Sequence, residues 1–245
     1  MSHVREHRSL LASAEKRLLI AIARRLPPWI SSDHLTLLGL VSMPAAGLAF
    51  AAIQRTPWNA ALFGLALFAN WFGDSLDGTL ARVRRQPRPN YGYYVDHVID
   101  LAGSAALIAG MAVSGLMHPS IAIAMLAAYL LVSAETFLAT HAVGAFRLSF
   151  AGIGPTELRI LLAVGAVSVS RHPWVQVAGQ RVLLLDVSAL IAIIGLVIVF
   201  IVSAIRNTRA LYLAEPLPGG AGSTDPGQTL PKSHKANRSI PLCQL

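Results

Sequence analysis

Long apolar runs, each bounded by short polar or charged segments, dominate the pattern of residues along this chain. A helix that crosses a membrane needs about 20 mostly apolar residues, and several of the runs reach that length. The pattern therefore predicts an all-α integral membrane protein with six transmembrane helices. The predicted spans cover residues 35–54, 58–80, 91–114, 118–141, 156–172 and 185–207.

A shorter amphipathic segment precedes the first predicted span. Within residues 10–26, apolar side chains such as Leu11, Leu18 and Ile22 lie near one helical face, and the basic residues lie mainly elsewhere. This pattern is typical of an N-terminal amphipathic helix in the membrane interface. An ordinary helix that packs against the bundle has the same pattern, and Pro27-Pro28 would end the helix in either case.

The composition changes abruptly after Tyr212 to Pro, Gly, Ser and other polar residues. Such a segment buries too little apolar surface to fold, so we expect a disordered tail. The predicted organisation is a juxtamembrane segment over residues 1–27, a six-helix domain over 28–213 and the C-terminal tail over 214–245.

Composition and charge agree with a membrane protein. Of all residues, 54% are hydrophobic and 13% are charged, whereas soluble domains carry about 25% charged residues. The net charge of +8 does not indicate nucleic-acid binding, because the basic residues flank apolar segments and are not gathered on a polar domain.

The basic residues instead predict an orientation. Of the 20 Lys and Arg residues, all except Arg55, Arg171 and Arg181 lie in the segments on one side of the six predicted spans or within a few residues of them. Short loops rich in Lys and Arg face the cytoplasm. Both termini are therefore predicted to be cytoplasmic, at the inner membrane if the cell is bacterial.

Four of the chain's 12 acidic residues lie within residues 74–100, at the predicted cytoplasmic ends of two apolar spans. Asp74 and Asp77 are three residues apart, and Asp96 and Asp100 are four apart, so each pair shares one face of its helix. Carboxylates that face one another near a membrane repel and lose solvation, so they require cations.

The ligand chemistry favours a hard divalent cation. Carboxylate oxygens suit Mg²⁺ or Mn²⁺ better than zinc or copper, and two ions would balance four negative charges. Two ions about 4 Å apart can hold a diphosphate and stabilise its reacting oxygens, and the nearby Arg82 offers a guanidinium to a phosphate. The predicted chemistry is therefore phosphoryl transfer.

Small residues accompany the acids on the same helical faces. Gly78 and Ala81 lie four and seven residues after Asp74, and Gly92 lies four residues before Asp96. Either glycine in isolation is more often a helix-packing residue. Next to the carboxylates, these residues indicate space for a ligand larger than a metal ion.

The stretch resembles the CDP-alcohol phosphotransferase family. That family's motif is matched at eight positions within 27 residues: Asp74, Asp77, Gly78, Ala81, Arg82, Gly92, Asp96 and Asp100. The spacer before Gly92 has nine residues here where the family usually has eight. Residues 32–36 resemble the family's Pro-Asn-x-x-Thr motif, although they have Asp33-His34 after Ser32 and lack the Pro-Asn pair.

The resemblance implies a transferase that moves a substituted phosphate group, such as a phosphatidyl group, from a CDP-alcohol to an acceptor hydroxyl and releases CMP. It implies that Asp74, Asp77 and Asp96 bind metal, and that Asp100 contacts metal and is the catalytic base. It further implies a homodimer and a CDP-alcohol donor, with CDP-diacylglycerol as the leading choice. The residues expected to line the CDP site are Gly78, Ala81, Arg82 and Gly92.

The acceptor is less defined by the sequence. Arg147 and Arg159 are candidates to bind an acceptor phosphate, whereas the alternative for Arg159 is a structural ion pair. His97, next to Asp96, resembles the Asp-His pair of the choline and ethanolamine phosphotransferases, which would act on diacylglycerol. A third hypothesis is a divalent-cation transporter, although an ion path does not need the small residues and Arg82 beside the acids.

Overall fold

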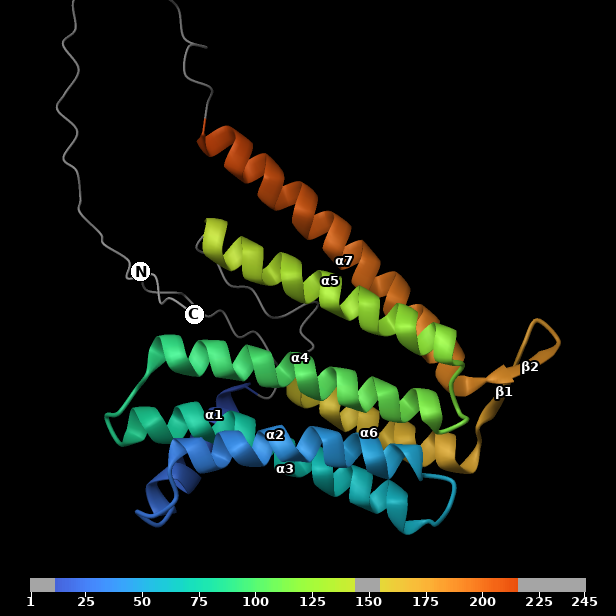
Figure 1. Ribbon diagram of the computed structural model, residues 1–245, viewed down its shortest axis with the longest axis horizontal. Helices are drawn as coiled ribbons and strands as arrows, with labels where there is room; N and C mark the ends of the chain where they lie inside the picture. Colours follow the sequence, from blue (N-terminus) through green and yellow to red (C-terminus); the bar gives the residue numbers. More distant parts are fainter. Residues whose placement is uncertain (1–11, 144–154, 216–245) are drawn as a thin grey trace, which may run out of the picture.

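The computed structural model describes residues 12–143 and 155–215 of the chain (Figure 1). These residues form mainly helices, with one antiparallel hairpin. Arg147 and residues 216–245 of the predicted tail lie outside the described part. The elements are α1 (Ala12–Arg25), α2 (Ser32–Ala51), α3 (Trp58–Val83), α4 (Pro89–Val113), α5 (Pro119–Val143), α6 (Pro155–Arg171), β1 (Trp174–Val177), β2 (Gln180–Leu183) and α7 (Leu184–Ala214).

Local signals explain where several helices begin. Pro89 and Pro119 are the first residues of α4 and α5, where a missing N–H costs no hydrogen bond. α2 begins with a capping box, because the Ser31 hydroxyl accepts from the backbone N–H of His34 and the His34 ring accepts from the backbone N–H of Ser31. Such caps satisfy N–H groups that the helix itself leaves unpaired.

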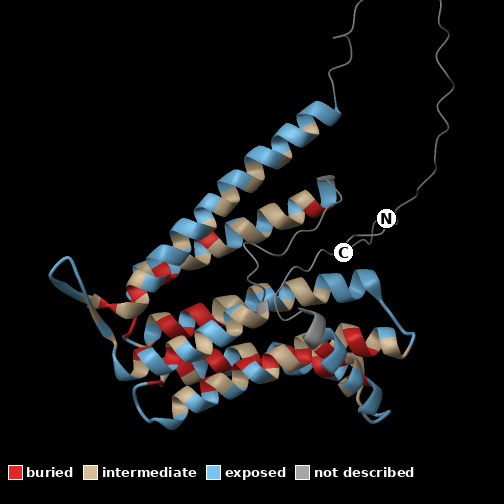
Figure 2. Cartoon of the chain, turned by 180° about the vertical axis from the view of Figure 1, so that it is seen from behind, coloured by how far each residue is buried: buried red, intermediate tan, exposed pale blue. Residues whose placement is uncertain are grey.

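The helices form two groups (Figure 1). α2, α3 and α4 pack together, α6 and α1 pack against α3, and α5 packs with α7. The α5–α7 pair diverges from the other helices, as Figure 2 also shows from behind. The main apolar core lies among α2, α3 and α4, where Phe50 and Phe63 make an edge-to-face contact with ring centroids 5.2 Å apart.

Polar contacts join α5 to α7. Glu135 accepts from the Ser203 hydroxyl at 2.8 Å and from the Asn207 amide at 2.7 Å. Near the other end, the buried Asp186 accepts from the backbone N–H of His118 at 2.9 Å and also contacts the His118 ring. Hydrogen bonds of this kind hold helices together where lipid gives no hydrophobic driving force.

Four of the described helices, α2, α4, α5 and α7, are long and apolar enough to cross a membrane. α7 exposes a row of large apolar side chains that includes Ile191, Ile194 and Ile198, as expected of a surface in contact with lipid. α6 has only 17 residues, and α3 carries Asn70 and Asp74 within its apolar run. Spans at α3 and α6, and hence six spans in all, therefore remain a prediction. The four long apolar helices make the protein a helical integral membrane protein.

α1 forms where the amphipathic segment predicts a helix, and it packs against α3. Leu19 and Ala23 are buried in a small core with Leu76 and Leu80, whereas Leu18 is 52% exposed. Packing against the bundle is therefore observed. A position of the exposed side of α1 in the membrane interface remains a prediction.

Glu15 of α1 joins this helix to two others. Its carboxylate accepts from the indole N–H of Trp71 on α3 at 2.7 Å and from the hydroxyl of Thr156 on α6 at 3.0 Å. These contacts fix the beginning of α6 next to α3.

The backbones of α2 and α4 touch where they cross. A Cβ atom added to Gly110 would overlap the carbonyl of Gly47, and one added to Gly47 would overlap the carbonyl of Ala106. Both glycines are helical, so close approach, and not unusual dihedral angles, requires them here.

Arg84 ties the end of α3 to the linker between α1 and α2. Its guanidinium donates to four backbone carbonyls, including Pro27 at 2.9 Å and Leu26 at 3.3 Å. These carbonyls follow the end of α1, where helical partners are missing. The side chain is therefore a structural link as well as a positive charge in a loop.

We expect Arg84→Gln to lower the free energy of unfolding by about 2 kcal/mol, because several hydrogen bonds from a charged donor are lost. Thermal unfolding of the purified protein in detergent measures the change. Arg85→Gln is the matched control, since the adjacent Arg85 is exposed and its substitution removes the same charge. Equal melting temperatures for the two variants would contradict a stabilising contact between Arg84 and the α1–α2 linker.

Candidate active site

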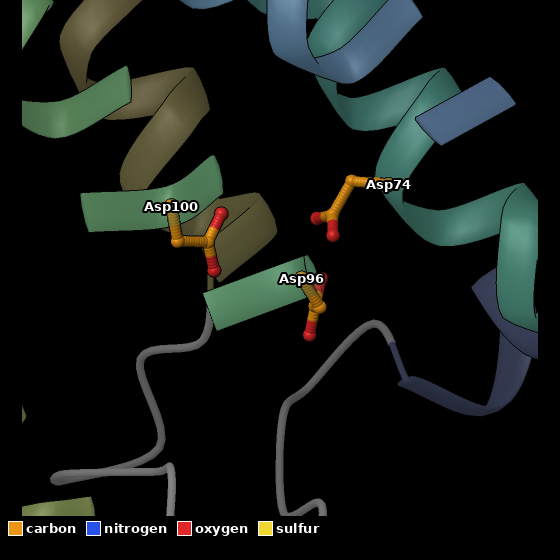
Figure 3. A group of neighbouring side chains, drawn as sticks. All are labelled: Asp74, Asp96 and Asp100. Carbon is orange, nitrogen blue, oxygen red and sulfur yellow. The ribbon is translucent and has the colours of Figure 1, made fainter. Parts of the chain in front are cut away.

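Three carboxylates meet between α3 and α4 (Figure 3). Asp74 comes from α3, and Asp96 and Asp100 come from successive turns of α4. One oxygen atom from each residue lies within 4.8 Å of the others. The structure thus brings together three of the four predicted metal ligands from segments that are separated by the α3–α4 loop.

Asp77 lines the same pocket but is held by α2 and by its own helix. Its Oδ2 atom accepts from the Thr36 hydroxyl at 2.9 Å, its Oδ1 accepts from the backbone N–H of Gly78, and its backbone carbonyl accepts from the Ser32 hydroxyl at 2.9 Å. The first turns of α2 therefore fix the orientation of the fourth predicted ligand.

The pocket is small and lies among α2, α3 and α4. α2 approaches α3 closely here, since a Cβ added to Gly73 would lie 2.5 Å from the carbonyl oxygen of Leu35. The residues that line the pocket are Thr36, Gly39, Asn70, Asp74, Asp77, Asp96, Ile99 and Asp100.

Arg159 reaches this site from α6. Its Nη2 atom donates to Asp74 Oδ2 at 2.7 Å, and its Nε atom donates to Asn70 Oδ1 at 2.9 Å. The predicted acceptor residue is thus paired with a predicted metal ligand, as the structural alternative for Arg159 expects. Arg147 lies outside the described residues.

The predicted CDP contacts lie at the ends of α3 and α4 and not in the lining of this pocket. A Cβ added to Gly92 would meet no atom within 4 Å, and one added to Gly78 would meet the Arg82 guanidinium at 3.5 Å. Arg82 is exposed and donates to the Thr79 hydroxyl at 3.2 Å, and Ala81 is half-buried. The position of Gly92 is thus open, and a role of these four residues in CDP binding stays a prediction.

The departures from the family motif have structural partners. Asp33 forms an ion pair with Arg88, a residue of the nine-residue spacer, and His34 belongs to the cap of α2. His97 contacts the Tyr93 carbonyl at 2.7 Å, and its ring lies 5.0 Å from that of Phe137 on α5. His97 therefore contacts a neighbouring helix.

Asn70 and Thr36 are site residues that the acidic motif alone does not predict. Asn70 is only 3% exposed and lies one turn before Asp74 in an otherwise apolar run. A polar residue four positions before Asp74 shares its helical face, and this spacing could have predicted Asn70 as a site residue. Thr36 occupies the threonine position of the first-span motif, and its contact with Asp77 gives that position a physical role.

The donor set fits a hard divalent cation. The clustered ligands are carboxylate oxygens, the class that magnesium, manganese and calcium prefer. Among the described residues, Arg159 forms an ion pair with Asp74 of this cluster. A divalent cation would offset the remaining negative charge.

The fold and the site together define a helical integral membrane protein with an acidic, oxygen-rich pocket suited to a divalent metal. A family model described as CDP-alcohol phosphatidyltransferase matches residues 29–201, and the chain belongs to this family. The resemblance inferred from the motif is confirmed. The protein is accordingly a transferase of substituted phosphate groups that uses a CDP-alcohol in phospholipid synthesis.

A solved structure shares the fold. It is a phosphatidylinositol phosphate synthase of Mycobacterium tuberculosis with CDP-DAG bound, with a TM-score of 0.53 and 20% sequence identity. The match covers 85% of this chain and 99% of that chain. No curated protein matches this chain.

Proposed function

We propose that this protein transfers a phosphatidyl group from CDP-diacylglycerol to the hydroxyl group of a phosphate-bearing acceptor and releases CMP. The observation that carries the proposal is the convergence of Asp74, Asp96 and Asp100 between α3 and α4. The solved relative of the same fold was crystallised with CDP-DAG, which supports this donor.

The proposed metal ligands are Asp74, Asp77, Asp96 and Asp100, with two Mg²⁺ or Mn²⁺ ions. When bound, the ions would neutralise the carboxylates and stabilise charge on the diphosphate of the donor. Thr36 and Arg159 already hold Asp77 and Asp74 in place, through hydrogen bonds of 2.9 and 2.7 Å. Such fixed ligands lower the reorganisation needed for binding.

Asp100 is the proposed catalytic base. It is the exposed member of the cluster, so an acceptor can reach it. Its carboxylate would take the proton of the acceptor hydroxyl as that oxygen attacks the phosphatidyl phosphorus. The bond from this phosphorus to the bridging oxygen then breaks, and that oxygen leaves as part of CMP.

The cytidine and diphosphate of the donor are proposed to lie along Gly78, Ala81, Arg82 and Gly92. The open space at Gly92 and the exposed Arg82 guanidinium beside Gly78 support this placement. An arginine can bind a phosphate through two parallel hydrogen bonds.

The acceptor phosphate is assigned to Arg147 and Arg159. Asp74 and Asn70 take two of the five N–H donors of the Arg159 guanidinium, so further donors of the same group can meet a phosphate.

A family likeness supports a homodimer, and the distribution of basic residues supports six spans with a cytoplasmic site.

Release of CMP by the purified protein tests the proposal. With CDP-diacylglycerol, Mn²⁺ or Mg²⁺ and a panel of acceptors, we expect release that depends on a phosphate-bearing acceptor and stops when EDTA removes the metal. Release only from CDP-choline or CDP-ethanolamine with diacylglycerol would overturn the donor assignment. Metal flux in liposomes without release from any donor would contradict the transferase reaction.

A further inference from the structure

Asp74 is joined to α2 and α6 by a chain of side-chain hydrogen bonds that the reaction itself does not explain. The Asn70 amide donates to the Gly39 carbonyl of α2 at 3.2 Å, and its oxygen accepts from Arg159 Nε at 2.9 Å. Arg159 Nη2 then donates to Asp74 Oδ2 at 2.7 Å. Three helices thereby converge on one carboxylate.

Both the amide nitrogen and the amide oxygen of Asn70 form hydrogen bonds in this chain of contacts. Asn70 is 3% exposed, and the Arg159 and Asp74 side chains are 16% and 27% exposed. A buried amide without partners would cost free energy, so the Asn70 oxygen holds the guanidinium at a fixed place. The guanidinium geometry matters, because a single side chain must donate to Asn70 and Asp74 through different nitrogen atoms.

We infer that Asn70 and Arg159 form a positioning pair that orients the Asp74 carboxylate for metal binding. This inference rests on the proposed metal role of Asp74. Arg159 contacts Oδ2 of Asp74, and the Asp74 carboxylate also lies in the cluster with Asp96 and Asp100. Partners that orient a ligand in this way are typically worth 10- to 100-fold in metal affinity.

Binding of Mn²⁺ to the purified protein, measured by electron paramagnetic resonance without any substrate, tests the inference. We expect Asn70→Leu to weaken Mn²⁺ affinity by about 10-fold or more. Asn59→Leu is the matched control, since Asn59 also lies on α3 and donates to a backbone carbonyl, that of Ala52, but does not line the pocket. The control should keep the affinity of the unsubstituted protein.

A double-mutant cycle separates positioning from general loss of structure. We expect Arg159→Gln to weaken Mn²⁺ affinity and Asn70→Leu to add little in that background, because Asn70 acts through Arg159. Arg159→Lys should fail to restore affinity, because an ammonium group lacks the two nitrogen donors of the guanidinium. Melting temperatures of the metal-free variants identify any protein that has not folded, and the Arg159 variants then carry the test.

Three outcomes would overturn the inference. Equal Mn²⁺ affinity for Asn70→Leu and Asn59→Leu would remove the positioning role while the proposed metal site stands. Tighter binding by Arg159→Gln would show that the guanidinium competes with the metal for Asp74. Absence of Mn²⁺ binding by the unsubstituted protein would overturn the proposed metal site, and this inference with it.

Discussion

Asp100→Asn is expected to lower the rate of CMP release by about 1,000-fold, because the amide cannot take a proton from the acceptor hydroxyl. The substitution also removes a negative charge from the cluster that Asp100 forms with Asp74 and Asp96. Initial rates should therefore be measured over a wide range of Mn²⁺ concentrations. If Asp100 is the catalytic base, the maximal rate of CMP release by Asp100→Asn stays low even at saturating Mn²⁺.

Asp33→Asn is the control for this experiment. Asp33 lies outside the pocket lining, and its ion pair with Arg88 is more than half exposed. Exposed ion pairs contribute at most about 1 kcal/mol, so this variant should release CMP at nearly the unsubstituted rate. Recovery of full activity by Asp100→Asn at high Mn²⁺ would show that Asp100 is a metal ligand only.

Gly110→Val is expected to cause the largest loss of stability among the substitutions considered. The added side chain would overlap the backbone of Gly47, so α2 and α4 would have to separate. Overpacking in a tight contact costs about 1–3 kcal/mol, and more where backbone must move. A fall in the melting temperature in detergent, together with loss of CMP release, would be the result.

Gly195→Val on α7 is the matched control, because a Cβ at Gly195 would meet no atom within 4 Å. It introduces the same side chain into another apolar helix, and its expected effect on stability is small. Similar melting temperatures for the two variants would show that contact at Gly110 is not what limits stability.

The acidic motif predicts much of the site because its information is local. Spacings of three and four residues place each acid pair on one helical face, and Asp74, Asp96 and Asp100 do meet in the structure. The apolar runs likewise predict most helices to within a few residues. The helical repeat determines which acids share a face, and the length of each apolar run determines the extent of its helix.

Contacts between distant segments cannot be read in the same way. Asn70 meets Arg159 across 89 positions of the chain, and Thr36 meets Asp77 across 41. No periodicity connects such residues, because their distance depends on how the helices pack. The hairpin of β1 and β2 was missed for another reason: its two four-residue strands are too short for a clear alternation.

The contact between Gly47 and Gly110 helps to set the angle between α2 and α4, two of the helices that line the acidic pocket. Asp100 lies 10 residues before Gly110 on α4, which is about 15 Å along the helix axis. A change of about 10° in the tilt of α4 at this contact would move Asp100 by roughly 3 Å relative to α2. That displacement exceeds the tolerance of about 0.5 Å that functional sites allow. The spacing of the carboxylates therefore depends on two glycines that lie outside the pocket lining.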